Sequence, residues 1–286
     1  PLVAGIPVVL VKGARQLRAH GMLPHANVLG GYLATSLIWV WGGYWISQQK
    51  PSIKWLLWCG LVLGGIALLL SFSRSSWLAI SITILIFLGL ALSHISRLKF
   101  NWPTWLAVIL LGAVVFTQWG PVVSRFHPEQ VDLEQESVSS RLDQWQQFKT
   151  LWPERLVAGV GIGQYTLYSQ QQDSKQLGWR YDAAAPGWTY NLSRQVWDYQ
   201  PIHNFWLMAL AELGWPGLLL LGWLWCGVLI LISQIIRSNL SVWGYLALAS
   251  WLSISILGLF DHYLWTLQQG RLMLFLSISI VVWLYQ

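Results

Sequence analysis

The chain has 286 residues, of which 55% are hydrophobic and 10% are charged, and its net charge is +6. Soluble domains carry about a quarter charged residues, so this composition excludes a soluble enzyme and indicates a polytopic membrane protein. The two cysteines, Cys59 and Cys226, lie in apolar stretches. We expect them to pack in the core rather than to form a disulfide framework or a metal cluster.

In chain order, the first apolar stretch, PLVAGIPVVLV, is too short to span a bilayer, and we interpret it as the end of a helix in an amino-terminally truncated chain. Seven later stretches are long enough to cross the membrane as helices. They are residues 27–46, 53–72, 75–93, 103–119, 205–232, 242–260 and 271–286. The sequence therefore predicts an all-α transmembrane bundle, with amino-terminal helices in 1–119 and carboxy-terminal helices in 204–286.

The hydrophilic stretch between these two groups, residues 120–203, holds nine of the eleven Asp and Glu residues. The short connections carry Lys and Arg evenly on both sides, so charge does not decide the orientation. Long loops cross membranes largely regardless of their charge, and arginines kept outside need a reason, such as a bound anion. We therefore expect residues 120–203 to form a large extracytoplasmic loop domain.

Alternation of the spans places most of the histidines on the side of this loop. They are His20, His25, His127, His203 and His262, joined by the two acids outside the loop, Glu212 and Asp261. Polar residues collect at helix ends because they reach water there, and that explains their location. The tendency to collect at helix ends does not explain why these residues gather on one side of the membrane. This one-sided clustering favours a functional site on that face.

Two arginines on the same side are candidates for binding an anion. Arg74, in SFSRSSWLA, lies in a turn so short that its guanidinium must be at the membrane boundary, where it either binds phosphate or carboxylate bidentately or simply snorkels. Arg141 precedes Leu142, Trp145 and Phe148, whose helical spacing predicts an amphipathic helix. Arg141 is either the second cation of the site or a surface partner of Asp143.

A proton acceptor is predicted at His203, directly before Asn204, which is a good N-cap for the fifth span. The positive end of the helix dipole favours the neutral imidazole there. The alternative is an interfacial histidine that donates to a backbone carbonyl. Glu212 is about half a turn out of phase with His203, so we expect a buried structural carboxylate paired with an arginine. Pro216 and Gly217 should interrupt the helix soon after it.

Three further motifs remain. Two of them have two interpretations each, and the glycine motif has a local one. Asp261 and His262 either orient polar groups or merely end the sixth span. The glycines of GVGIGQY are not followed by GK[ST], so they predict a tight turn before a helix rather than a nucleotide site. GWRYDAAAPGWTYNLSRQVWDYQP, which includes Trp197 and Tyr199, suits either sugar rings or an interfacial aromatic belt.

Taken together, the motifs resemble a known family. SFSRSSWLA, SRLDQW leading into GVGIGQY, HNFWLMALAELGWPG and FDHYLWTLQQGR occur in this order, as in the O-antigen ligase and O-antigen polymerase-like membrane proteins. RAHGMLPHANVLGGYLA resembles a further element, with Pro24-His25-Ala26-Asn27 in place of the usual Asn-Pro-Asn. The resemblance runs across nearly the whole chain.

This resemblance implies glycosyl transfer outside the cytoplasmic membrane, from an undecaprenyl-pyrophosphate-linked glycan to an acceptor hydroxyl, with neither a metal nor a nucleotide sugar. Carried over by motif, Arg74 and Arg141 bind the pyrophosphate and His203 activates the acceptor. Further predicted substrate-binding residues are Arg18, Asn27, Asn204, Glu212, Asp261, His262, Trp197 and Tyr199.

The main alternative from another class is a polytopic transporter, but the predicted spans carry almost nothing charged apart from Glu212. A protein O-oligosaccharyltransferase of the same family is a further alternative. Ligase and polymerase use the same donor and a hydroxyl, so the acceptor stays open among glycan, lipid and protein. We expect membrane lipid and the lipid-linked donor as partners, and no nucleic acid.

Overall fold

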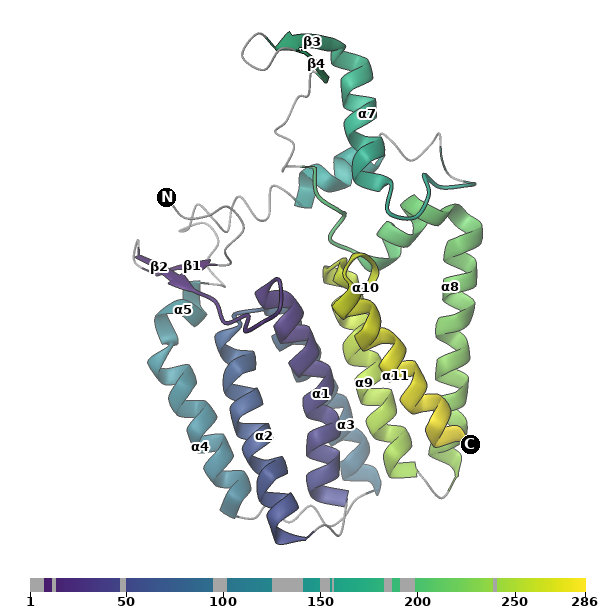
Figure 1. Ribbon diagram of the computed structural model, residues 1–286. Coiled ribbons are helices and arrows are strands. Elements are labelled where there is room, and N and C mark those ends of the chain that lie inside the picture. The colour runs from purple at the N-terminus through teal and green to yellow at the C-terminus, as the bar shows by residue number, and fades with distance from the viewer. Residues whose placement is uncertain are drawn as a thin grey trace. The chain divides into compact units, whose positions relative to one another are not determined.

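The computed structural model describes residues 8–11, 14–46, 50–94, 102–124, 141–149, 155, 157–182, 187–190, 199–238 and 241–286 (Figure 1). These residues are mainly α-helical, which confirms the predicted all-α class. Two short antiparallel hairpins accompany the helices, β1 (Val8–Val11) with β2 (Ala14–Leu17) and β3 (Trp179–Asp182) with β4 (Gly187–Tyr190). The prediction of a helix end at the start of the chain is therefore wrong for residues 8–11.

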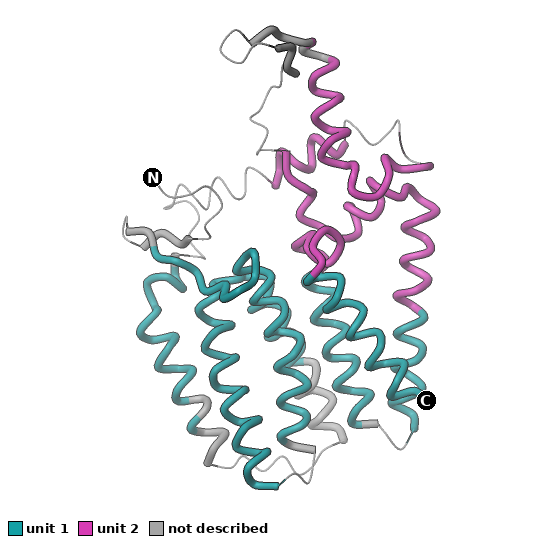
Figure 2. Tube along the Cα trace, viewed as in Figure 1, with its two compact units in different colours: residues 1–136, 227–257, 269–286 teal, residues 137–226, 258–268 magenta. Residues whose placement is uncertain are grey.

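The chain forms two compact units, each assembled from distant segments (Figure 2). Unit 1 comprises Pro1–Glu136, Gly227–Leu257 and Gln269–Gln286, and unit 2 comprises Ser137–Cys226 and Gly258–Gln268. The predicted division into 1–119, 120–203 and 204–286 separates membrane helices from a loop outside the membrane. The two compact units do not test this division, so it stays a prediction.

In unit 1, the amino-terminal helices are α1 (Ala26–Ile46), α2 (Pro51–Leu70), α3 (Arg74–His94), α4 (Trp102–Thr117) and α5 (Trp119–Ser124). From α1 to α4, successive helices run antiparallel, and α1 packs against both α2 and α3 (Figure 1). Small residues permit this close packing: a Cβ on Gly64 of α2 would lie 2.7 Å from Leu37 Cδ2 of α1.

The carboxy-terminal helices are α8 (Phe205–Arg237), α9 (Ser241–Phe260) and α11 (Gln268–Tyr285). Within unit 1, α9 packs on α1 through Ile38, Leu246 and Ala249. Trp39 Nε1 donates a hydrogen bond to Ser250 Oγ at 3.1 Å, which adds a polar link between the same two helices.

Every predicted span forms a helix, and four helices in the described residues are long and apolar enough to cross a membrane: Pro51–Leu70, Phe205–Arg237, Val242–Phe260 and Gln268–Tyr285. Large apolar side chains are exposed on them, including Trp223 and Phe275. Such surface suits lipid rather than water, so the protein is a multi-pass membrane protein. The count of seven spans stays a prediction. Cys59 and Cys226 are also exposed, so the prediction of core packing is wrong for both.

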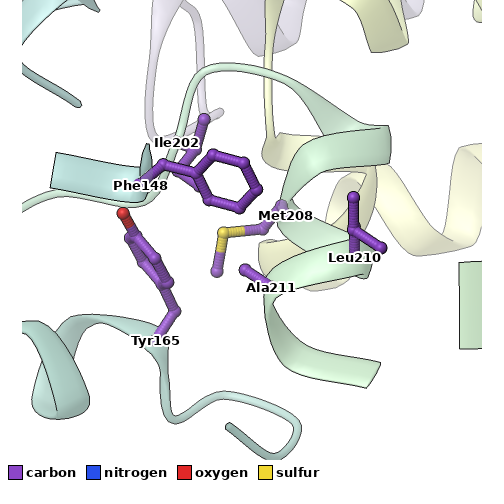
Figure 3. Packing of buried hydrophobic residues seen from close by; sticks show 6 residues of the cluster. All are labelled: Phe148, Tyr165, Ile202, Met208, Leu210 and Ala211. Carbon is purple, nitrogen blue, oxygen red and sulfur yellow. The ribbon is translucent and has the colours of Figure 1, made fainter. Parts of the chain in front are cut away.

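Unit 2 contains the helical segment 141–149, α7 (Tyr165–Leu177), the first part of α8, and α10 (Tyr263–Thr266). Its apolar core is formed by Phe148, Tyr165, Ile202, Met208, Leu210 and Ala211 (Figure 3). The helix predicted from Leu142, Trp145 and Phe148 is confirmed and spans 141–149, but of these three only Phe148 is buried. Leu142 and Trp145 are exposed, whereas Gln144 and Phe148, which are one turn apart, are buried.

Candidate active site

In unit 1, Arg18 joins the segment before α1 to the turn between α2 and α3. Its Nε donates to the backbone oxygen of Ser71 at 2.8 Å, and its Nη2 donates to Asn27 Oδ1 at 2.6 Å. Arg18 is buried, so these bonds fix the geometry of the turn. Arg18 and Asn27 were predicted to bind substrate. In the structure both make structural contacts, and contact with substrate stays a prediction.

That turn leads directly into Arg74, the first residue of α3. Phe72 takes a left-handed conformation (φ 47°), and Ser73 Oγ lies 2.8 Å from Ser76 Oγ. The backbone N–H groups at a helix N-terminus favour anions. The position of Arg74 at this end of α3 is compatible with the predicted anion binding, which stays a prediction.

In unit 2, His203 is held by Gln144, a residue 59 positions earlier. The backbone N–H of His203 donates to Gln144 Oε1 at 3.3 Å, and His203 Nδ1 lies 2.9 Å from the same oxygen. Because a backbone N–H can only donate, the amide oxygen of Gln144, not its nitrogen, must face His203. Nδ1 therefore carries the proton, and in the neutral ring Nε2 carries the lone pair.

His262 has a local hydroxyl partner, Thr266. Its Nδ1 lies 2.6 Å from Thr266 Oγ1, whose own proton goes to the backbone oxygen of His262 at 3.3 Å. Thr266 therefore accepts from Nδ1–H, and the lone pair of His262 is again on Nε2. Burial lowers the pKa of His262, and the smaller opposing effect comes from Asp261. The neutral ring is thus favoured.

The two imidazoles meet each other and a buried carboxylate. Their ring centroids are 5.0 Å apart, with the planes at 79°. Asp261, only 5% exposed, accepts the backbone N–H of His262 at 2.9 Å. One ligand atom from each of His203, Asp261 and His262 lies within 4.8 Å of the other two, so this group is the candidate cation site among the described residues.

Glu212, on α8, is a buried structural carboxylate, as predicted, with an exposed fraction of 2%. It accepts hydrogen bonds from the backbone N–H of Gly163 at 2.8 Å and of Tyr165 at 3.4 Å, and from Trp265 Nε1 at 2.7 Å. Among the residues that the structure describes, none of these partners is an arginine, so the predicted arginine pairing is wrong there. The carboxylate instead links three segments of unit 2.

The glycine motif forms the predicted tight turn before α7. Gly159, Gly161 and Gly163 all have positive φ angles, of 67°, 99° and 72°. The turn is pinned to α8 because Val160 N donates to Ala211 O and Gly161 N donates to Glu212 O, both at 2.9 Å. The contact is too close for a side chain: a Cβ on Gly159 would lie 2.3 Å from the Glu212 oxygen.

The break in α8 lies at Gly214, with φ 69° and ψ −169°, and not at Pro216 or Gly217 as predicted. Pro216 comes two residues later, near the start of the second helical part, where its missing N–H costs little. A Cβ on Gly214 would lie 2.2 Å from the backbone oxygen of Val157. The kink therefore makes room for the glycine turn.

Two other predicted substrate-binding residues have structural contacts. Asn204 is the N-cap of α8, as predicted, because its Oδ1 accepts Leu207 N at 2.9 Å; its Nδ2 also donates to Leu259 O at 3.0 Å. The buried Tyr199 donates its hydroxyl proton to Asp173 Oδ2 of α7. For both, contact with substrate stays a prediction.

The aromatic stretch is described only in part. Trp197 lies outside the described residues. The β3–β4 register pairs Trp179 with Tyr190 and Tyr181 with Trp188. The choice between a sugar-binding surface and an interfacial aromatic belt stays open.

Unit 2 thus contains His203, Asp261, His262 and Arg141, the last at the start of the segment that carries Gln144. Arg18, Asn27 and Arg74 belong to unit 1. The sequence prediction missed Gln144 and Thr266, which set the two imidazole tautomers. The sequence feature that could have identified Gln144 is its position one helical turn before Phe148, which places the two residues on the same helix face.

Comparison with known families agrees with this set of motifs. The family described as O-antigen ligase matches residues 59–222, which is more than half of the 286-residue chain. The chain belongs to the O-antigen ligase family. The segment that matches this family includes Arg74, Arg141 and His203, whereas Asp261 and His262 lie beyond it. No curated protein matches the chain. Membership in the O-antigen ligase family points to membrane glycosyl transfer of the ligase or polymerase type.

Proposed function

We propose that the protein transfers a glycan from undecaprenyl-pyrophosphate to an acceptor hydroxyl at the outer face of the cytoplasmic membrane. His203 is the general base, and Arg74 and Arg141 bind the pyrophosphate. The family match supports the class of reaction. The observation that carries the mechanism is the pair of bonds from His203 to Gln144 Oε1, at 3.3 and 2.9 Å.

Gln144 matters because a general base needs an unprotonated nitrogen directed at the acceptor. With the proton held on Nδ1, Nε2 of His203 takes the proton of the acceptor hydroxyl. The acceptor oxygen forms a bond to the anomeric carbon as the bond from that carbon to the pyrophosphate oxygen breaks. The electron pair leaves with the pyrophosphate, and a single displacement inverts the anomeric centre.

The leaving pyrophosphate gains negative charge in this step. Two guanidiniums stabilise that charge through bidentate hydrogen bonds, so transfer needs no resident divalent ion. Arg74 at the N-terminus of α3 adds the favourable helix dipole to its own charge. Arg141 is partly buried and belongs to the same unit as His203.

A transporter is less well supported, because Glu212 is engaged by three hydrogen-bond donors instead of lining a polar path. The acceptor hydroxyl belongs to a sugar, a lipid or a protein side chain, and protein O-glycosylation within the same family is the alternative that shares this chemistry.

Replacing Gln144 tests the mechanism. In purified protein with a lipid-linked glycan donor, Gln144→Met should lower kcat about 10- to 100-fold and leave KM for the donor unchanged. The expected loss is a part of the rate enhancement of about 10²- to 10⁴-fold that a general base contributes. Methionine keeps the volume but offers no strong acceptor for Nδ1–H. Gln144→Glu keeps the acceptor and should restore most of kcat.

The matched control is Gln146→Met, at an exposed position of the same helical segment, which should keep its kcat. A Gln144→Met enzyme with normal kcat would remove tautomer control from the mechanism. Equal losses in both variants would show that the effect is on the segment and not on His203.

Replacing the arginines tests the pyrophosphate site. Arg74→Lys and Arg141→Lys should each lower kcat/KM for the donor about 10- to 100-fold, because a charge-assisted hydrogen bond contributes about 1.5–3 kcal/mol and an ammonium cannot make the bidentate contact. Arg237→Lys, at the exposed end of α8, is the control and should be neutral. If lysine serves equally well at both positions, the arginines do not bind the pyrophosphate bidentately.

A further inference from the structure

The group formed by His203, Asp261 and His262 has the composition of a transition-metal site. One ligand atom from each residue lies within 4.8 Å of the other two. A tetrahedral zinc ion about 2.0–2.2 Å from each ligand atom requires separations of about 3.3 Å, so shifts of about 1 Å in the side chains complete the site. Two imidazoles and one carboxylate leave a fourth position for water.

A second, independent observation is the arrangement around the rings. Each Nδ1–H is directed at an acceptor, Gln144 Oε1 at 2.9 Å for His203 and Thr266 Oγ1 at 2.6 Å for His262. Histidines that bind metals are held in this way, with one ring nitrogen donating to a neighbouring acceptor and the other facing the ion. With each Nδ1 donating, Nε2 is the ring nitrogen that would ligate an ion, and the buried carboxylate of Asp261 supplies negative charge.

We propose that Nε2 of His203, Nε2 of His262 and the carboxylate of Asp261 bind a zinc-type divalent ion, and that this ion switches off glycosyl transfer. The inhibition rests on the proposed function, because the ion occupies the lone pair that His203 uses as the base. The binding itself does not depend on it. Imidazole ligands select zinc, cobalt or nickel over magnesium, which prefers oxygen.

Binding is measured first, on the full chain purified in detergent and freed of metal with EDTA. Cobalt should bind at one site per chain, with visible absorption that zinc, but not magnesium, removes. His262→Gln and Asp261→Asn should each weaken zinc binding at least tenfold, because each removes one of three ligands. Thr266→Val should weaken it about tenfold through the lost orientation of His262. His20→Gln, a histidine of unit 1, should have no effect.

Transfer is then measured with zinc and with EDTA, and each variant is compared with its own rate in EDTA. Zinc should inhibit the wild-type enzyme reversibly, and about tenfold more zinc should be needed for Thr266→Val. Absence of cobalt and zinc binding to the wild-type chain overturns the site, whatever the transfer assay gives. Binding without inhibition, or stimulation by zinc, overturns the inhibitory role and leaves the binding site standing.

Discussion

Replacement of His203 by alanine is expected to lower kcat by about 10²- to 10⁴-fold, the usual contribution of a general base. This corresponds to about 3–5 kcal/mol of transition-state stabilisation. The reason is that the variant loses Nε2, the nitrogen left unprotonated by the bond from Nδ1 to Gln144. The measurement is steady-state transfer from a purified lipid-linked glycan.

The backbone bond from residue 203 to Gln144 does not need the imidazole, so the fold of unit 2 should persist in His203→Ala. Thermal unfolding in detergent, compared with the wild-type chain, checks this. His20→Ala is the control for the loss of a histidine, since His20 Nδ1, among the described residues, contacts only the local Leu23 oxygen, at 3.0 Å. If His203→Ala transfers glycan at the wild-type rate, His203 has no part in the chemistry.

Replacement of Gly159 by alanine is expected to destabilise unit 2 by on the order of 4 kcal/mol, which is large for a single substitution. The new Cβ would lie 2.3 Å from the Glu212 backbone oxygen, in a backbone with φ 67°. To relieve the clash, the turn must leave α8, which breaks the bonds from Val160 N and Gly161 N at 2.9 Å. Tryptophan fluorescence during thermal unfolding measures the loss.

Gly163→Ala is the matched control within the same motif. Gly163 has φ 72°, but no atom of the described residues other than its chain neighbours lies within 4 Å of its missing Cβ, so this variant carries the left-handed strain of about 1–2 kcal/mol without that clash. The comparison therefore separates strain from contact with α8. Equal destabilisation by the two substitutions would mean that the turn is not pinned at Gly159.

Much of the fold could be predicted because its signals are local. Long apolar stretches mark the helices, Asn204 before an apolar run marks a cap, and the glycine series before Tyr165 marks a turn. The same local signals failed where a short segment could adopt more than one backbone conformation. Residues 8–11 formed a strand in a hairpin, and the break in α8 came at Gly214 and not at Pro216.

The candidate site was predictable in its residue types but not in its hydrogen bonds. Glu212 was expected to pair with an arginine, yet the structure supplies two backbone N–H groups and the indole of Trp265, 53 residues away. A buried carboxylate takes whichever donors the packing brings to it. Sequence spacing within one helix cannot name donors that come from another segment.

The sequence by itself determined the class of this protein, because composition and apolar length are properties of the chain that need no partner. It also selected His203, Arg74 and Arg141 as the residues with suitable chemistry. Only the tertiary structure decided which nitrogen of His203 carries the proton. That choice depends on Gln144, 59 residues away, and a tautomer is set by the hydrogen-bond partner in space and not by neighbours in the chain.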